Sequence, residues 1–228
     1  MPDTLGDAHQ SLADLVYLRL REQIIEGEHP AGQRLVEREL ADGLGVSRIP
    51  VREAMQRLER EGFLTVQARR GAFVADFGPA DAEHFFAVRE SLEALAASLA
   101  ARNATATGIR GLERLLARTC KAAEAGRVRE SADLNADFHR AIVDLSGNPL
   151  LRDMMAPLDG RLRRLFRLTS DAETSAPMCT EHQQLLDAIK ARDPEAAAVL
   201  ARHHVAGTRA FALQVLGGQT PGRQSPGR

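Results

Sequence analysis

The segment 34–74 constrains the fold more than any other part of the chain, because its residue pattern changes from helical to alternating within a short distance. Gly45 can adopt the positive φ that ends a short helix over about residues 37–43. A second helix is expected to begin at Ser47, whose hydroxyl can cap the free N–H groups of the first turn. After Gly62 the residues alternate in polarity, which is typical of two short strands in a hairpin. Helix, turn, helix and hairpin in this order predict a winged helix-turn-helix, a fold that binds DNA.

The second helix of this segment has one apolar face and one basic face. Residues spaced by three and four positions predict the face that packs on the first helix: Val51, Ala54, Met55 and Leu58. The opposite face carries Arg48 and Arg52 near the helix N-terminus, the end that such a helix presents to base edges and phosphates in the major groove. At the hairpin tip, Arg69, Arg70 and Gly71 suit a contact with the sugar-phosphate backbone or the minor groove.

Arginines often do no more than keep a helix surface solvated. Whether they indicate DNA binding therefore depends on the local balance of charge. Between residues 47 and 71 six arginines face three glutamates, although the whole chain has a formal charge of −1 at pH 7. This local concentration of charge predicts a compact DNA footprint rather than indiscriminate binding to polyanions. The aromatic content is 4% and tryptophan is absent, which argues against stacking on single-stranded bases. Duplex DNA is therefore the expected partner.

The segment LVERELADGLGVSRIPVREAMQRLEREGFLTVQARRGAFV resembles the signature of the GntR family. The similarity extends upstream through VYLRLREQIIEGEHPAGQRL and covers about residues 10–77. Carried over position by position, the resemblance implies DNA contacts from the following residues: Arg38, Ser47, Arg48, Arg52, Arg69, Arg70 and Gly71. Ile49 departs from the family pattern, because many members carry Thr or another small polar residue there.

From about residue 78 onward the pattern is helical throughout, so the chain is expected to be mainly α. We predict a DNA-binding domain over 10–77 and an all-α domain over 78–217, which dimerises and binds an effector. The expected helices are separated by Gly- and Pro-containing breakers and span about 80–103, 106–126, 128–146, 149–169, 175–192 and 194–216. The Gly-, Pro- and Ser-rich tail over 218–228 is expected to be disordered.

Composition also indicates where the protein acts. Residues 1–12 lack the basic and apolar regions of a secretory leader, and no apolar run approaches the ~20 residues needed to cross a bilayer. A cytoplasmic protein that does not act at a membrane is therefore expected. Two cysteines, Cys120 and Cys179, are too few for a disulfide framework, and both are interpreted as ordinary packing residues in a reducing cytosol.

Three histidines in the helical half are expected to point into the core. His182 and His204 each share a helix face with apolar residues about one turn away, and His139 lies four residues after Asn135 on one helix. Three helices would thus supply three imidazoles and an amide oxygen, a set that Zn²⁺, Ni²⁺ or Mn²⁺ would accept with positions left for water or a ligand. Buried histidines are more often hydrogen-bonded core residues than metal ligands, so the spacing alone leaves both interpretations open.

The segments LNADFHRAIVDLSGNPLL and EHQQLLDAIKARDPEAAAVLARHHV resemble the FCD effector domain of the FadR-type GntR subgroup, an antiparallel helical bundle. In members that bind a metal, the ligand positions correspond to Asn135, His139, His182 and His204 here, although many members carry Asp at the first. Arg89 matches an arginine that the family often directs into its effector pocket, where it could bind a carboxylate. The alternative for Arg89 is a surface ion pair with Glu93 at i+4.

These features predict a ligand-responsive transcription regulator rather than an enzyme. We expect a homodimer that reads a palindromic operator, with a small carboxylate effector, such as an organic or sugar acid, bound at the metal and controlling DNA affinity. The resemblance implies a repressor. A dimeric architectural DNA-binding protein without an effector is one alternative. A metal-dependent hydrolase is another, disfavoured because the sequence has no HExxH motif, nucleophile motif or Gly-rich phosphate loop.

Overall fold

The structure is a computed structural model that describes residues 11–169 and 172–218, and it divides the chain into two units between Asp76 and Phe77. The fold class is confirmed as mainly α, with a small sheet in the first unit and helices alone in the described part of the second. The tail predicted over 218–228 lies outside the described residues except for Gly218.

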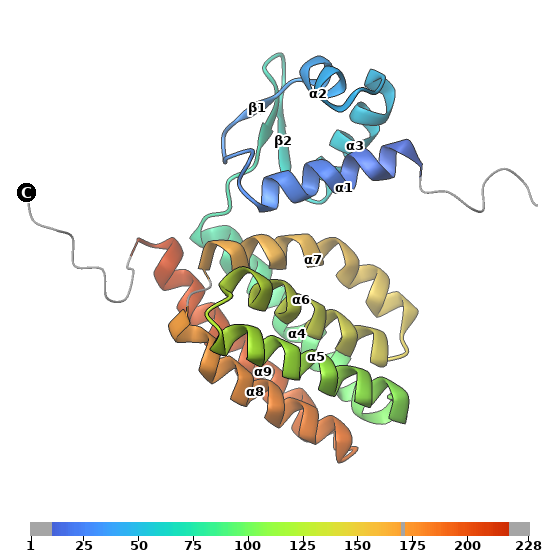
Figure 1. Cartoon of the computed structure of the whole chain (residues 1–228), viewed down its shortest axis with the longest axis vertical. Helices are drawn as coiled ribbons and strands as arrows, with labels where there is room; N and C mark the ends of the chain where they lie inside the picture. Colours follow the sequence, from blue (N-terminus) through green and yellow to red (C-terminus); the bar gives the residue numbers. More distant parts are fainter. Residues whose placement is uncertain (1–10, 170–171, 219–228) are drawn as a thin grey trace, which may run out of the picture. The chain divides into compact units, whose positions relative to one another are not determined.

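The first unit contains three helices and a three-stranded sheet (Figure 1). Its elements are α1 (Leu12–Ile25), β1 (Arg34–Leu35), α2 (Glu37–Leu44), α3 (Arg48–Arg60), β2 (Leu64–Gln67) and β3 (Gly71–Val74). The sheet order is β1-β3-β2, and both pairings are antiparallel. The hairpin of β2 and β3 was predicted, whereas the two-residue strand β1 was not, because so short a segment carries no detectable alternation.

Local backbone geometry sets the helix-turn-helix. Gly45 ends α2 with a φ of 67°, the left-handed conformation that the sequence predicted. Ser47 occupies the N-cap position of α3 with extended backbone, but its side chain makes no capping hydrogen bond, so the predicted cap is wrong in that detail. Pro50 lies in the first turn of α3, where its missing N–H costs no helical hydrogen bond.

The core of the first unit fixes which face of α3 points outward. Leu20 of α1 packs with Val51 and Leu58 of α3, and all three side chains are buried. The Tyr17 hydroxyl on α1 donates a 2.6 Å hydrogen bond to Glu61 just after α3. Because the apolar side of α3 is held on α1 in this way, the opposite side of α3 stays at the surface.

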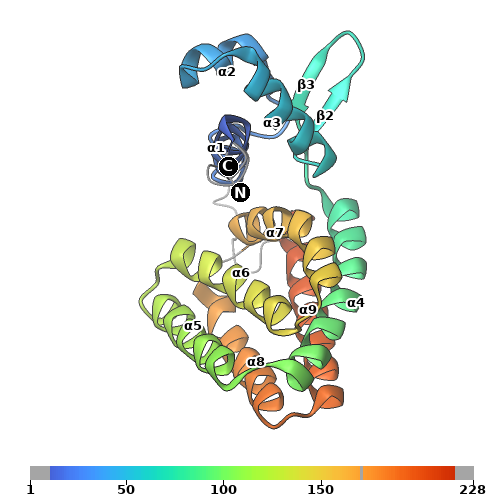
Figure 2. The ribbon, with the colours of Figure 1, turned by 90° about the vertical axis from the view of Figure 1, so that its right-hand side faces the viewer.

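The described part of the second unit contains six helices. They are α4 (Pro79–Asn103), α5 (Ala106–Glu124), α6 (Val128–Leu145), α7 (Pro149–Thr169), α8 (Ala172–Lys190) and α9 (Pro194–Leu216). Helices α4 and α9 lie alongside each other, and α5 packs on α6 and α8 (Figure 2). No helix among the described residues combines the length and the apolar character that crossing a bilayer requires.

Cys120 on α5 and Cys179 on α8 form a disulfide, with their Cα atoms 5.8 Å apart. The interpretation of both as ordinary packing residues is therefore wrong. Fifty-nine positions separate the two cysteines in sequence, and only the packing of α5 against α8 brings them together. The rotation of one helix against another is a tertiary property that residue spacing does not contain.

Candidate functional site

Three histidine side chains from three helices meet inside the second unit. His139 on α6, His182 on α8 and His204 on α9 are buried, and their ligand nitrogens lie within 4.8 Å of one another. The Nε2 atoms of His182 and His204 are 3.2 Å apart. Two nitrogens at about 2.1 Å from one metal ion lie roughly 3.0–3.4 Å apart at octahedral or tetrahedral angles. The observed spacing fits two ligands of a single ion.

Burial keeps two of these imidazoles neutral. It lowers the pKa of His139 to about 4, although the Glu93 carboxylate acts in the opposite direction. Burial also lowers the pKa of His182 well below its usual value, and the neighbouring His204 and His139 add to that effect. A metal ion binds the lone pair of a neutral imidazole. Both side chains are therefore in their metal-binding form at neutral pH.

Two glutamates orient the histidine rings. Glu93 Oε2 lies 2.9 Å from Nδ1 of His139, and Glu181 Oε2 lies 2.7 Å from Nδ1 of His204. Each carboxylate assigns the ring proton to Nδ1, an arrangement typical of metal-binding histidines. The lone pair is then on Nε2, which in His139 faces Arg89 Nη2 at 3.2 Å. Sequence reasoning missed both roles. The position of Glu181 directly before His182 is the one signal that could have drawn attention to it.

Asn135 Oδ1 and His182 Nδ1 are buried and have no hydrogen-bond partner among the described residues. Asn135 lies on α6 one turn before His139, and 4% of it is exposed. An unsatisfied buried acceptor costs about 1–3 kcal/mol, so a cation near Asn135 would remove a penalty. Three neutral imidazoles and an amide oxygen form a donor set that suits a borderline divalent ion such as Zn²⁺, Ni²⁺ or Mn²⁺.

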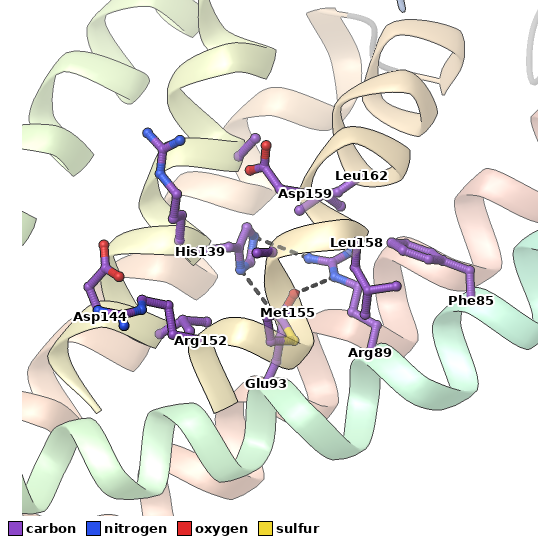
Figure 3. Close-up of a pocket in the computed structure, with 14 residues that line it drawn as sticks. Phe85, Arg89, Glu93, His139, Asp144, Arg152, Met155, Leu158, Asp159 and Leu162 are labelled. Atoms are coloured by element: carbon purple, nitrogen blue, oxygen red, sulfur yellow. Dashed lines mark hydrogen bonds and ion pairs between the residues drawn. The ribbon is translucent and has the colours of Figure 1, made fainter. Parts of the chain in front are cut away.

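Arg89 lies at the boundary between this cluster and a cavity of about 260 Å³ (Figure 3). The arginine is 1% exposed, and its Nε donates a hydrogen bond to Glu93. Its Nη2 lies 3.2 Å from His139 Nε2, and its Nη1 is buried without a partner in the described part of the chain. The pairing with Glu93 thus exists, but in the interior rather than at the surface.

The positive charge of Arg89 keeps the Glu93 carboxyl ionised. Burial alone would raise the pKa of Glu93, but the charge of Arg89 and the hydrogen bond from His139 hold that pKa far below its usual range. The buried pair of Arg89 and Glu93 is therefore charged. Charges in the interior persist only when they are paired, so each of these two side chains fixes the position of the other.

The walls of the cavity are largely apolar, and its exposed rim is charged. Five larger apolar side chains line it: Phe85, Val143, Met155, Leu158 and Leu162. Arg140, Asp144 and Arg152 also line it and are exposed to solvent. His139, Arg89 and Glu93 lie next to one another and are joined by hydrogen bonds and ion pairs (Figure 3). The cavity thus reaches the histidine cluster through His139.

The structure places the other set of site residues on the surface of the first unit. Arg38 on α2, and Ser47 and Arg48 at the start of α3, are exposed. Arg69 and Arg70 are exposed at the hairpin tip, where Arg70 donates its backbone N–H to the Gln67 carbonyl at 3.0 Å. Gly71 has a φ of 102°, and a Cβ there would lie 3.2 Å from the Arg34 guanidinium. Both constraints favour glycine at this position.

Arg52 is held by a neighbouring helix. Its Nε and Nη2 atoms donate to the two Glu37 carboxylate oxygens at 3.0 and 2.9 Å. The side chains remain 53% and 34% exposed, so the pair contributes little to stability. Its effect is orientation, because a bidentate pair holds the planar guanidinium in one plane beside α3. The sequence identified Arg52 but gave no indication of its partner.

Comparisons with known proteins divide the chain at the same place as the structure does, between the helix-turn-helix unit and the helical unit. The FCD domain family matches residues 84–207, and the family described as bacterial regulatory proteins, gntR family, matches residues 12–74. The chain is 33% identical over 199 residues to the HTH-type transcriptional regulator McbR of Escherichia coli, covering 86% of this chain and 90% of that protein. It is 26% identical to the HTH-type transcriptional repressor RspR of E. coli, covering 82% of each chain. The solved structure of E. coli McbR aligns with a TM-score of 0.76 over 92% of this chain and 99% of that one, at 28% identity.

Proposed function

Since the chain belongs to the GntR family of bacterial regulatory proteins and carries an FCD domain, we propose that it is a transcriptional regulator whose DNA affinity responds to a small carboxylate bound beside a metal ion. The family and the relatives are regulators and not enzymes. A DNA-binding regulator acts where the chromosome is, so we place it in the cytoplasm. The observation that carries the proposal is the cluster of His139, His182 and His204 adjoining a cavity.

The proposed metal ligands are the three histidines and Asn135. Support comes from the separation of the histidine nitrogens, the neutral state of His139 and His182, and the unsatisfied Asn135 oxygen. When bound, a Zn²⁺, Ni²⁺ or Mn²⁺ ion would offer positive charge and an open coordination position to an anionic ligand. An amide brings no negative charge, so this ligand set would leave more positive charge on the ion than one containing a carboxylate.

We propose that the effector is an organic acid with a small apolar body. The buried Arg89 Nη1 has no acceptor among the residues that the structure describes, and a carboxylate oxygen is the acceptor that a guanidinium binds best. The apolar walls would contact the body of the ligand, and the volume of about 260 Å³ limits it to a small molecule. A sugar acid fits less well, because hydroxyls placed against Phe85, Met155 and Leu158 would lose water at the apolar walls.

On the DNA side, we propose that α3 enters the major groove and the β2–β3 hairpin contacts the backbone or minor groove. The exposed positions of Arg48, Arg69 and Arg70 support this assignment. One recognition helix reads only a few base pairs, so we propose a homodimer on a palindromic operator. Repression is the proposed direction of regulation, in keeping with the printed description of RspR as a repressor.

The metal assignment is tested by comparing His204→Gln with His203→Gln. The two histidines are adjacent on α9, but His204 is buried in the cluster and His203 is exposed. After chelator treatment and reloading with Zn²⁺, Ni²⁺ or Mn²⁺ in turn, the bound metal per chain is measured by mass spectrometry. Wild type and His203→Gln should retain one of these ions through gel filtration, and His204→Gln should lose it. Absence of all three ions from the wild type contradicts the proposal.

A further inference from the structure

We propose that Cys120 and Cys179 form a reversible redox site, and that its oxidation holds α8 in the position that the histidine cluster requires. The disulfide joins α5 to α8. Cys179 lies three residues before His182 on α8, a spacing that places both on neighbouring parts of one helix face. Glu181 lies two residues after Cys179 and accepts the hydrogen bond from His204. A covalent link at Cys179 therefore constrains the helix segment that carries His182 of the cluster and the Glu181 partner of His204.

The two ends of α8 are held differently. Toward its C-terminus, Leu185, Leu186 and Ile189 are buried in the apolar core. In the described segment 177–181, the residues are exposed or half-buried, so apolar packing holds that part weakly. Pro177 lies within the helix and has no N–H to donate, which removes one helical hydrogen bond just before Cys179. The disulfide adds a covalent attachment to this weakly packed part of α8.

The compartment and the composition favour reversibility. The proposed cytoplasmic location is reducing, and disulfides that form in such compartments are usually transient or redox-sensing. The chain has two cysteines in total, so neither sulfur can exchange with a third thiol of its own chain. Cys120 and Cys179 are both half-buried rather than fully enclosed, which leaves them within reach of small reagents.

The reaction balances with peroxide as the oxidant. A thiolate of one cysteine attacks hydrogen peroxide, the O–O bond breaks, and a sulfenic acid and hydroxide form. The second cysteine then attacks the sulfenic sulfur, the S–S bond forms, and the sulfenic oxygen leaves as water. In sum, two thiols lose two electrons and two protons, and one peroxide becomes two waters. Two molecules of a low-molecular-weight thiol reverse the change by successive exchange and leave as their own disulfide, with both cysteines regenerated as thiols.

The first experiment establishes the redox site itself. The folded protein is treated with hydrogen peroxide or with a phosphine reductant, and free thiols are counted by alkylation and intact mass. We expect two free thiols in the reduced protein, none in the oxidised protein, and full return on reduction without unfolding. A folded protein that cannot be cycled between these states overturns the proposal, because the disulfide would then be either permanent or never formed.

The second experiment measures the link to the histidine cluster and rests on the proposed metal site. Zn²⁺ affinity is measured by competition with a chromogenic chelator, with peroxide removed beforehand. We expect the oxidised wild type to bind Zn²⁺ about tenfold more tightly than the reduced wild type, which is the size of effect typical of groups that orient metal ligands. Cys120→Ser and Cys179→Ser should match the reduced wild type under both conditions. Equal affinities in the two redox states overturn the link.

A third readout separates failure of this inference from failure of the metal site. Hydrogen exchange of the α8 amides over residues 178–182 is measured in the metal-free protein, oxidised and reduced. We expect faster exchange after reduction, because the helix segment loses its attachment. If no metal binds but exchange still responds to redox state, the metal site fails and the effect on α8 stands. If exchange is unchanged, the redox effect on α8 is overturned whatever the metal result.

Discussion

Nδ1 of His204 lies 2.7 Å from Oε2 of Glu181, while Nε2 of the same ring faces Nε2 of His182 at 3.2 Å. One ring thus connects a carboxylate on α8 with the centre of the histidine cluster. The carboxylate fixes which nitrogen carries the proton, and it makes the opposite nitrogen a better electron donor. The geometry indicates that Glu93 and Glu181 raise the metal affinity of the histidines as well as fixing the orientation of their rings.

Replacing Glu181 with Gln should therefore weaken metal binding without abolishing it. The amide still fits the space, but it removes the negative charge that orients and polarises His204. We expect a loss of roughly 10- to 100-fold in Zn²⁺ affinity, measured by chelator competition. Asp187→Asn on the exposed side of the same helix is the matched control and should behave as wild type. Equal affinities for Glu181→Gln and wild type would show that the carboxylate has no such role.

The stability of the metal-free protein should fall as the pH drops from about 6.5 to 4. His139 has a folded-state pKa of about 4 against an ordinary value of 6.5, so in this range the unfolded chain binds a proton that the folded chain does not. Stability is thus full above 6.5 and is lost progressively below it. The expected loss is on the order of 3 kcal/mol, measured by urea unfolding. His139→Gln should reduce the dependence and leave the part that the buried His182 contributes, and His203→Gln should leave it unchanged.

Arg52 should contribute directly to operator recognition. Arg52→Gln should weaken binding to a selected operator by roughly 5- to 150-fold, the range that one bidentate base contact supplies, while weakening binding to random DNA much less. Glu37→Gln should show a smaller loss, because it releases the guanidinium from its fixed plane. Arg19→Gln, on the exposed side of α1, is the control. Fluorescence anisotropy measures all four proteins, and unchanged specificity in Arg52→Gln would refute the assignment.

The disulfide should stabilise the oxidised protein whatever its regulatory role. Oxidised wild type should have an unfolding free energy roughly 2–4 kcal/mol above that of Cys120→Ser, because the cross-link restricts the unfolded chain. With a reductant present, the two proteins should unfold at nearly the same urea concentration. A difference that persists under reduction would show that the serine hydroxyl, rather than the missing cross-link, causes the loss.

Much of the fold could be predicted because its signals are local. Helical periodicity, Gly45 and the breakers between the later helices gave the element order, and the apolar spacing placed the three histidines inside the second unit. The strand β1, the contacts of Glu93 with His139 and of Glu181 with His204, and the pairing of Cys120 with Cys179 could not be obtained in this way. Each depends on the rotation of one helix, or the register of one strand, against a neighbour, and the periodicity of a single element does not contain that information.

The most direct test of the account is operator affinity measured with the metal bound and with it removed, each against a panel of small carboxylates. The operator is first selected by the protein from a random DNA library, and affinity is measured by fluorescence anisotropy. We predict that one apolar carboxylate changes operator affinity by roughly 5- to 150-fold in the metal-loaded protein and has no effect on the metal-free protein. If no carboxylate changes operator affinity in either form, the helical unit does not sense a carboxylate through this site and the central proposal is wrong.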